Sequence, residues 1–326
     1  MSEIGSFLEF DFSPSSELQF HNKGSIDEKK LNIGRAGIYY ALLQLNINEI
    51  LIPYYMCPSV EKFLIKKGVK VKFYKLDEEM SPNLDGNNQT QAILIPNYFG
   101  LKSIIEMNSI IKRFTNVILD NSQSFYTNPI DGAYNIYSPR KFFGVPDGCL
   151  VYGKKKVDIL FENDFSAITA NFLFVRHELG CQNSYELRME NEKRLDNSDI
   201  KEMSKLSEKI LLQIDYKNLG LKRLSNFLYV HSQIGNKNNL DVLKFFDSTC
   251  YPMVYPLVIE NEAILNILKE NSIFTGRWWS SVKKFEEVNE SDIEYKLSNY
   301  MLPLPIDQRY NFDDLKKYCD IIQKYN

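Results

Sequence analysis

Residues 32–60 read NIGRAGIYYALLQLNINEILIPYYMCPSV, and this stretch indicates the fold. The small residues of 34–37 open an apolar run with helical character, and residues 49–53 form a short β-rich run that ends in proline. Pro58 then falls in the first turn of another helical run, a position that proline favours. Helix, strand and helix in close succession predict a domain in which the two kinds of element alternate.

The alternation continues to residue 152. Apolar runs predict strands at 69–76, 92–96, 117–120, 133–137 and 149–152, and amphipathic runs predict helices at 58–67 and 103–114. This order predicts an α/β fold with a mostly parallel central sheet flanked by helices. Ligands on such sheets bind beyond the carboxyl ends of the strands, where Asp120 and the segment after Tyr137 fall.

The second half of the chain has a different character. Residues 183–216 are charged and mostly helical, and later helices alternate with a few strands, notably at 253–259. We therefore place a domain boundary near residue 220. It divides a large domain of residues 1–220 from a smaller α+β C-terminal domain of residues 221–326.

The composition is that of an ordinary globular protein, with 326 residues, 44% of them hydrophobic and 25% charged. A formal net charge of −3 gives no basic excess, which argues against a nucleic-acid partner. No apolar run approaches about 20 residues, the length that spans a bilayer, and the N-terminus has neither the basic start nor the apolar core of a secretory signal. We therefore expect no membrane partner.

Cysteine usage points to a reducing compartment. The five cysteines are scattered, odd in number and without a CxxC pair, and the chain has three histidines. This pattern does not match a zinc site, so no metal is expected. Reduced thiols predict a cytoplasmic protein.

The turn Gly34-Arg35-Ala36-Gly37 is a candidate phosphate site. Small residues at a helix start let a phosphate approach bare backbone N–H groups, and the helix dipole favours an anion there. Arg35 could add a charge-assisted hydrogen bond. The alternative is a plain turn before a helix, since this pattern is neither a Walker loop nor a Rossmann fingerprint.

Asp120 ends a predicted strand, and Gln123 follows three residues later. A carboxylate in that position can pair with a protonated ring nitrogen, the arrangement that makes the ring of pyridoxal phosphate (PLP) an electron sink. Gln123 is close enough along the chain to reach the same ligand. The alternative is an aspartate that caps the following loop.

Residues 137–148, YSPRKFFGVPDG, place Lys141 in a loop of aromatic and small residues. Lysine is seldom buried without a task, and burial beside a cation such as Arg140 would favour the neutral amine that forms a Schiff base. Ser138 could bind phosphate, and the glycines would shape a tight loop. The alternative is a surface turn with a solvated lysine.

Two segments near the C-terminus are further candidates. Residues 302–310, LPLPIDQRY, form a proline-marked extended segment in which Asp307 and Arg309 pair with each other or cap the next helix. The sequence Trp278-Trp279 follows a glycine and an arginine. These two tryptophans are core or interface residues, or they contact the ring of a substrate.

Taken in this order, the segments resemble the DegT/DnrJ/StrS family of PLP-dependent sugar aminotransferases, which have the fold-type-I architecture. The resemblance covers nearly the whole chain and is sharpest from residue 34 to residue 148. It rests on NIGRAGIYYAL for the family's phosphate turn, ILIPYYMCPSV and AILIPNYFG for two of its strands, Asp120 and Gln123 for its D-x-x-Q motif, SPRKFFGVPDGC for its lysine loop and LPIDQRY for the entry to its last helix.

The resemblance implies a role for each of these residues. Lys141 would hold PLP as a Schiff base and then shuttle protons, Asp120 would hold the pyridine nitrogen, and Gln123 would lie near the phenolic oxygen of the ring. Cys57 stands where many members carry an aromatic residue that stacks on the cofactor. The residues expected to contact the phosphate are Arg35, Ala36 and Ser138.

The resemblance also implies a reaction and an assembly. An amino group, usually from glutamate, would move onto a keto group of a nucleotide-linked sugar, for a surface polysaccharide such as O-antigen. The protein would be a homodimer in which each site is completed by the partner subunit. The polar residues that could reach across the dimer, or else form solvated helix faces, are Arg176, Asn183, Arg223 and Asn226.

A second function stays open. The chain could be a non-transaminating relative, such as a PLP-dependent dehydratase, or a binding or regulatory protein that kept the fold. The lysine loop is shorter than in most family members, and Cys57 replaces the stacking aromatic residue. A family dehydratase is expected to carry His in place of the Schiff-base lysine, and a binding protein would be free to lose Lys141 or Asp120. Because both residues are present, the enzyme is favoured.

Overall fold

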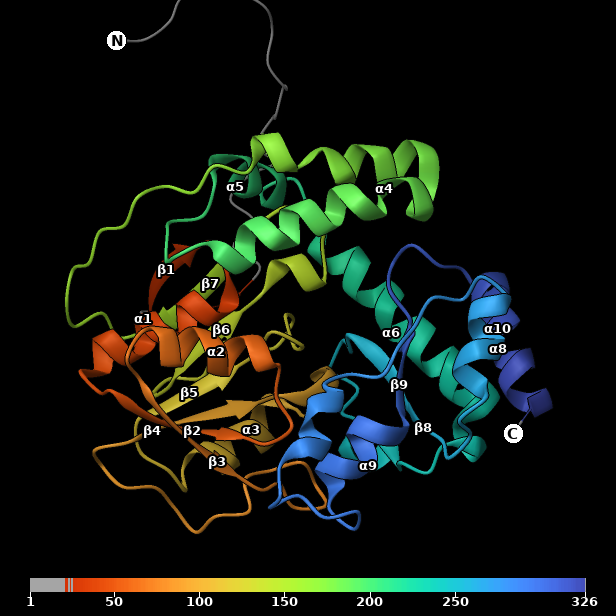
Figure 1. The fold of residues 1–326 in the computed structure, drawn as a ribbon, viewed down its shortest axis with the longest axis horizontal. Coiled ribbons are helices and arrows are strands. Elements are labelled where there is room, and N and C mark those ends of the chain that lie inside the picture. The colour runs from red at the N-terminus through yellow and green to blue at the C-terminus, as the bar shows by residue number, and fades with distance from the viewer. Residues whose placement is uncertain (1–20, 23, 25, 326) are drawn as a thin grey trace, which may run out of the picture.

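The computed structural model describes residues 21, 22, 24 and 26–325, and its first unit is built on a seven-stranded sheet (Figure 1). The strand order is β1-β7-β6-β5-β4-β2-β3. The strands are β1 (Asp27–Leu31), β2 (Glu49–Pro53), β3 (Lys70–Tyr74), β4 (Ala92–Pro96), β5 (Val117–Asp120), β6 (Tyr134–Tyr137) and β7 (Cys149–Gly153).

The sheet is mostly parallel, as predicted. Strands β3, β2, β4, β5 and β6 pair in parallel, and β7 runs antiparallel between β6 and β1. The strand β1, DEKKL, was not predicted, because its charged sequence has no apolar run. Since β7 alone is reversed, β1, β5 and β6 end at the same edge, and this edge positions the candidate site.

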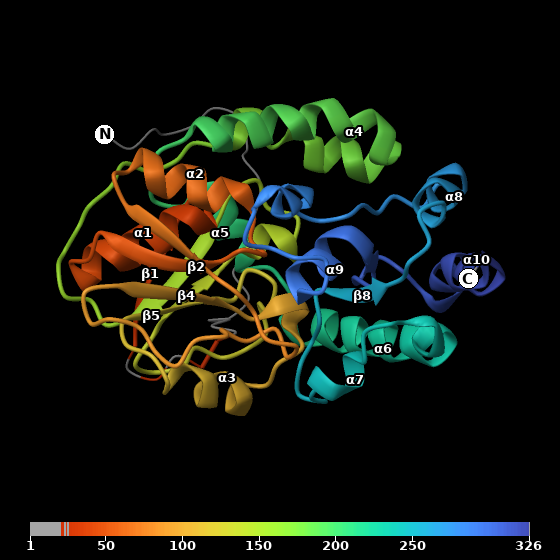
Figure 2. The ribbon, with the colours of Figure 1, turned by 60° about the horizontal axis from the view of Figure 1, so that its bottom comes forward.

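Helices lie on both faces of the sheet. Helices α1 (Gly34–Leu45) and α2 (Pro58–Lys66) lie on one face, and α3 (Ile104–Ile111) lies on the other (Figure 2). Beyond α2 lies α4 (Asn171–Asn197), which breaks at Gly180, where φ is 83°. The two arms of α4 form a projection, here called the helical lobe. Helix α5 (Lys205–Leu211) follows it.

A glycine lets α1 pack directly on the sheet. A Cβ atom on Gly37 would lie 2.6 Å from Cys149 Sγ, and 3.0 and 3.2 Å from methyl groups of Val151 and Ile136. These three residues belong to β6 and β7 and are fully buried. The start of α1 is therefore held against the strands that carry the lysine loop.

The second unit is a small α+β assembly. Strands β8 (Val254–Val258) and β9 (Met301–Pro305) form an antiparallel pair. The helices around them are α6 (Tyr216–Ile234), α7 (Val242–Phe245), α8 (Ile264–Glu270), α9 (Ile293–Tyr300) and α10 (Phe312–Tyr325). The predicted domain boundary at residue 220 lies inside helix α6. The division into two domains stays a prediction.

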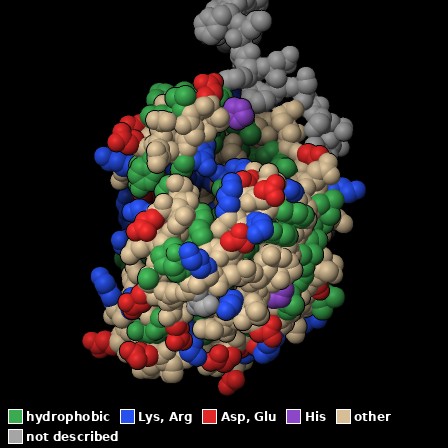
Figure 3. All heavy atoms as spheres, turned by 90° about the vertical axis from the view of Figure 1, so that its right-hand side faces the viewer, with side chains coloured by type: hydrophobic (Ala, Val, Ile, Leu, Met, Phe, Trp, Pro, Cys, Tyr) green, Lys and Arg blue, Asp and Glu red, His purple; other side chains and the backbone are tan. Residues whose placement is uncertain are grey.

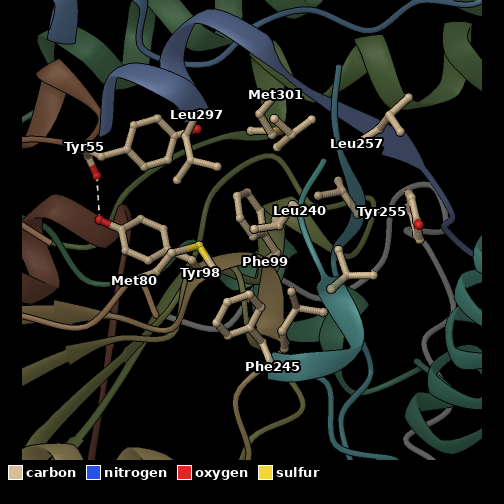
Figure 4. Packing of buried hydrophobic residues seen from close by; sticks show 14 of the residues in the cluster. Tyr55, Met80, Tyr98, Phe99, Leu240, Phe245, Tyr255, Leu257, Leu297 and Met301 are labelled. Atoms are coloured by element: carbon tan, nitrogen blue, oxygen red, sulfur yellow. Dashed lines mark hydrogen bonds between the residues drawn. The ribbon is translucent and has the colours of Figure 1, made fainter. Parts of the chain in front are cut away.

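One hydrophobic core joins the two units (Figure 4). It contains Tyr98 and Phe99 from the loop after β4, together with Tyr255 and Leu257 from β8. The hydroxyl of Tyr98 donates a hydrogen bond of 2.6 Å to the backbone oxygen of Tyr55 inside this cluster. Because apolar burial is the dominant stabilising term, the shared core fixes the second unit against the edge of the sheet.

The described residues contain neither a membrane span nor a metal cluster. None of their helices is both long and apolar enough to cross a membrane. The same residues contain no group of three or more His, Cys, Asp or Glu side chains arranged to hold a metal ion.

The packing of α1 on the sheet can be tested with Gly37→Ala. The new methyl group would overlap Cys149, so we expect the free energy of unfolding to fall by about 1–3 kcal/mol in urea denaturation. Adding Cys149→Ala to Gly37→Ala should recover part of this loss, because it removes the sulfur atom that the new methyl group overlaps. Gly86→Ala is the control, because its nearest atom would lie 3.5 Å away, and a change within about 0.5 kcal/mol is expected. Unchanged stability in Gly37→Ala would contradict the close packing.

Candidate functional site

Two serine hydroxyls and the glycine that begins α1 meet in a polar cluster at the carboxyl edge of the sheet. The hydroxyls of Ser122 and Ser138 lie 3.0 Å apart, and they follow β5 and β6. A Cβ atom on Gly34 would lie 2.6 Å from Ser138 Oγ and 3.5 Å from Ser122 Oγ. The absent side chain of Gly34 therefore lets the backbone approach two hydroxyl groups closely, and we call this place the anion cradle.

The start of α1 completes the anion cradle. The residue before the helix is Ile33, which offers no side-chain cap. The backbone N–H groups of Gly34 and Arg35 have no acceptor among the described residues, whereas that of Ala36 donates to Ile33 O at 3.1 Å. Free N–H groups and the positive end of the helix dipole favour a phosphate or another anion here.

The side chain of Arg35 points away from the anion cradle. Its guanidinium donates to the backbone oxygen of Leu195 at 2.7 Å and to Asp196 Oδ1 at 3.1 Å, at the end of α4. It also lies over the ring of Phe63, 5.7 Å from the centroid. A contribution of Arg35 to anion binding would therefore come from its backbone N–H group.

Asp120 and Gln123 lie beside the anion cradle, in the loop after β5. Asp120 Oδ1 accepts the N–H of Ser122 at 2.9 Å, and its other oxygen has no partner among the described residues. Gln123 is buried, and its Oε1 accepts the N–H of Phe99 at 2.9 Å. Phe99 has a φ of 60°, a strained value for a bulky residue, which this contact helps to hold.

Among the residues it describes, the structure shows no aromatic ring that substitutes for the stacking residue expected at the position of Cys57. Cys57 caps the start of α2 and contacts Ser59 Oγ at 3.1 Å. The nearby ring of Tyr54 stacks on Phe73, with centroids 5.1 Å apart. The ring of Tyr55 is fully buried and packs 4.6 Å from the ring of Trp279.

Lys141 ends a short 3₁₀ turn (Pro139–Lys141) and is exposed, with no hydrogen-bond or ion-pair partner among the described residues. The prediction that the aromatic loop buries this lysine was wrong. Such a turn sends successive side chains in different directions, so Phe142 and Phe143 enter the core instead. Arg140 is tied to Glu192 by an ion pair.

A buried carboxylate anchors the loop that carries Lys141. Asp147 is fully buried and accepts hydrogen bonds from the backbone N–H of Ser204, at 2.8 Å, and from the hydroxyls of Ser204 and Ser207. The N–H of Gly148 donates to Asn32 O at 2.6 Å, two residues before Gly34. The lysine loop and the anion cradle are thus tied to each other by a direct backbone contact.

Lys141 lines a pocket of about 250 Å³ between the two units. Trp278 and Arg223 line it from the second unit, together with Asp307. Arg309 binds both carboxylate oxygens of Asp307, at 2.7 and 2.8 Å, which confirms the predicted pair. Although burial disfavours the charged carboxylate, Arg309 holds the pKa of Asp307 below its ordinary value, so the pair is ionised at neutral pH.

The four residues proposed to reach a partner subunit fall into two groups. Arg223 and Asn226 are buried within their own chain, so a solvated helix face is wrong for both. Asn226 Nδ2 donates to three backbone oxygens around residue 307. Arg176 and Asn183 lie on the helical lobe, partly buried and exposed respectively.

Sequence reasoning missed several residues of this region. Ser122, two residues after Asp120, and Asp147, in the lysine loop, were given no role. A serine two residues after a strand-ending aspartate is the signal that could have found the first. Arg223 was named as a residue that could reach a partner subunit, but its buried place at the pocket of its own chain was not predicted.

Comparison with known proteins gives one clear result. No protein-family model and no curated protein matches the chain. Several solved structures match the chain in fold. An aminotransferase of the DegT/DnrJ/EryC1/StrS type from Brucella abortus is 14% identical, with a TM-score of 0.59 over 92% of this chain and 86% of that one. NtdA from Bacillus subtilis, solved with bound cofactor PMP, is 15% identical, with a TM-score of 0.62 over 91% and 73%.

DesI, solved in the presence of its TDP-sugar product, is 12% identical, with a TM-score of 0.61 over 93% of this chain and 81% of that one. At these identities the likeness establishes a shared fold. The predicted α/β architecture, a mostly parallel sheet flanked by helices, is therefore confirmed both by the sheet and by these neighbours.

Replacing Asp147 tests the anchoring of the lysine loop. Asp147→Ala would leave a buried N–H group and two buried hydroxyls without their acceptor, so the free energy of unfolding should fall by about 2–3 kcal/mol. Chemical denaturation measures this change. Asp85→Ala, at an exposed site, is the control and should change stability by less than about 0.5 kcal/mol. Equal stability of the two variants would contradict the anchor.

Proposed function

We propose that this chain, which has the fold of the sugar aminotransferases, is itself a PLP-dependent aminotransferase. It moves an amino group onto a keto group of a nucleotide-linked sugar. The observation that carries the proposal is the grouping of the anion cradle, Asp120 and the free amine of Lys141 along one edge of the sheet. A phosphate, a ring nitrogen and an aldehyde are the groups of PLP that need such partners.

The residues present fit this cofactor. The anion cradle has the bare backbone and the two hydroxyls that a phosphate needs, in a space that a single Cβ atom would fill. Among the described residues, one oxygen of Asp120 and the amide NH₂ of Gln123 have no partner, so they could bind a protonated ring nitrogen and the phenolic oxygen respectively. Bound PLP would supply an electron sink for the carbon that carries the amino group.

The chain's own residues supply binding and proton transfer. Gly34 and Ser138 would bind and orient the phosphate, and the negative charge of Asp120 would favour a protonated ring nitrogen. Lys141 would hold the cofactor through Nζ and would carry a proton at the same atom. Its exposure to the pocket gives the substrate access to this amine.

The substrate and the pathway form the finer part of the proposal. DesI was solved in the presence of its TDP-sugar product, which supports a nucleotide-linked sugar as acceptor. Glutamate as donor, and a role in surface polysaccharide such as O-antigen, follow from the sequence resemblance. The five cysteines of the chain are all free, and reduced thiols support a cytoplasmic location.

A second candidate is a relative that binds PLP without transaminating. It is favoured by Cys57, because the aromatic rings nearest to it are committed to the core and cannot stack on a cofactor ring. The two candidates differ in how glutamate affects the bound cofactor. An aminotransferase converts bound PLP to its amine form, whereas the second candidate leaves it unchanged.

We also propose a homodimer that forms through the helical lobe. Exposed apolar side chains gather there and on the segment before it, and Figure 3 shows some of them at the top of the molecule. A contiguous apolar surface is typical of a protein interface. Among these exposed residues are Phe165, Ile168, Phe174, Leu179, Tyr185 and Met189. Asn183 lies among them and would reach the site of the partner.

The cofactor assignment predicts a covalent product. Incubation with PLP, reduction with borohydride and peptide mass spectrometry should place the cofactor on Lys141. Lys141→Ala should carry no adduct and should lose transamination by more than about 10²-fold, because a proton-transfer group is removed. Lys154→Ala, at an exposed lysine, should behave as the wild type. Retained transamination in Lys141→Ala, with its circular dichroism unchanged, would contradict the assignment.

The dimer predicts a mass of twice 38.1 kDa by light scattering after gel filtration. A charge at Leu179→Glu would be buried without a partner in the interface, so this variant should run as a monomer. Ile105→Glu is the control, because Ile105 is similarly exposed on α3, on the opposite face of the sheet. A wild-type monomer, or an equal effect of the two substitutions, would rule out an interface at the lobe.

A further inference from the structure

A second pocket lies at the opposite edge of the sheet from Lys141. It is found where β1 and β6 begin and where β7 ends, and its volume is about 180 Å³. Residues of β1, α1, β6 and β7 and of the segment after β7 line it, and none of them belongs to the anion cradle. We call it the tyrosine pocket, after Tyr40 and Tyr134 in its wall.

The two tyrosine rings are held firmly in place. Tyr134 lies across β7, because Gly153 has no side chain and a Cβ atom there would lie 2.3 Å from the tyrosine ring. The hydroxyl of Tyr134 donates to Lys154 O at 2.6 Å. Tyr40, on α1, is 5% exposed, and its ring packs edge-on against Phe161 with centroids 6.3 Å apart. The pocket therefore has a fixed aromatic wall.

The hydroxyl of Tyr40 has no hydrogen-bond partner among the described residues, although its ring is buried. Burial raises the pKa of Tyr40, and the carboxylates of Asp158, Glu202 and Asp27 raise it further. Since Asp158 and Asp27 line the same pocket as Tyr40, the hydroxyl lies toward the acidic side of that pocket. A phenol hydroxyl both donates and accepts, so it offers a ligand a lone pair.

The charge around the tyrosine pocket is negative. Its acidic lining residues are Asp27, Glu28 and Asp158, and its basic ones are Lys29 and Lys155. Lys29 forms an ion pair with Glu202, which does not line the pocket. Lys155 pairs with Asp158 at 3.0 Å, but both side chains are exposed, so the pair contributes little. A cation is therefore the favoured ligand.

The walls decide which kind of cation fits. The described residues contain no group of three or more His, Cys, Asp or Glu side chains arranged to hold a metal ion. An ammonium group needs fewer fixed ligands, because one carboxylate, one hydroxyl and one aromatic ring bind it well. The volume of about 180 Å³ is small for a ligand site and suits a short alkyl chain.

We propose that the tyrosine pocket binds a small primary ammonium ion, with Asp158 and the hydroxyl of Tyr40 as acceptors and the ring of Tyr134 against the alkyl chain. The ligand displaces Lys155 from Asp158, which costs little because that pair is exposed. This site goes beyond the proposed function. It lies at the other edge of the sheet and stands whether or not the chain binds PLP.

Isothermal titration calorimetry of the full-length protein with butylamine measures this binding, since butylamine is a cation at neutral pH. The alcohol n-butanol has the same chain length and no charge, so it should bind at least about 10-fold more weakly. Butyrate, which carries the opposite charge, should show no heat of binding. The Kd for butylamine should be the same in Lys141→Ala, whereas an amine that bound at the proposed cofactor site would lose affinity in this variant.

Substitutions in the pocket should change the Kd in opposite directions. Tyr40→Phe removes only the hydroxyl, and Asp158→Asn removes only the charge, so each should raise the Kd about 5- to 10-fold. Lys155→Met removes the cation that competes for Asp158 and should lower the Kd about 2- to 5-fold. Tyr39→Phe is the matched control on α1, because that ring packs 6.4 Å from the Phe63 ring and does not line the pocket. Its Kd should equal that of the wild type.

Three outcomes would overturn the proposal. They are equal affinity of the wild type for butylamine and n-butanol, an unchanged Kd for butylamine in Tyr40→Phe or Asp158→Asn, and loss of butylamine binding in Lys141→Ala. The comparison of butylamine with n-butanol uses the wild type, so it decides even if a variant fails to fold. Absence of any butylamine binding by the wild type counts as the first of these outcomes.

Discussion

The contact between the start of α1 and the ends of β6 and β7 is the constraint on which the site depends. Gly34 and Gly37 have no side chains, so α1 approaches the sheet until its first turn lies against Ser138 and its second against Cys149. The first turn of the helix therefore begins beside the hydroxyls of Ser138 and Ser122. A side chain at Gly34 would displace the serine that leads into the lysine loop.

Two further features hold Lys141 at this edge. Asp147 fastens the loop to α5 through three hydrogen bonds, and the backbone of Gly148 bonds to Asn32, which precedes α1. The shared core then sets the second unit against the loop, so that Arg223 bonds to Phe142 O. Lys141 follows Ser138 of the anion cradle by three residues and lines the pocket. The proposed function depends on this position, which would give its amine access both to a cofactor at the cradle and to a substrate in the pocket.

The bounds of an element are predicted best where its residues form a continuous apolar run. The strands at 92–96 and 117–120 have the predicted bounds, because both are apolar and lie in the middle of the sheet. The sequence misses β1, which is charged, and it cannot place Lys141, whose exposure depends on its position in a 3₁₀ turn. The grouping of Asp120 with the anion cradle was predictable from strand ends. The place of Arg223 was not, because its partners are backbone oxygens far away in the sequence.

The measurement that tests the central claim most directly is the visible absorption spectrum of the purified protein with PLP, recorded before and after the addition of glutamate. The account predicts an absorption band of lysine-bound PLP that fades as the amine form of the cofactor accumulates. Such a result requires the cofactor, the lysine and the first half of the transfer to operate together. A protein that gives no band with PLP would contradict the claim that this edge of the sheet is a cofactor site.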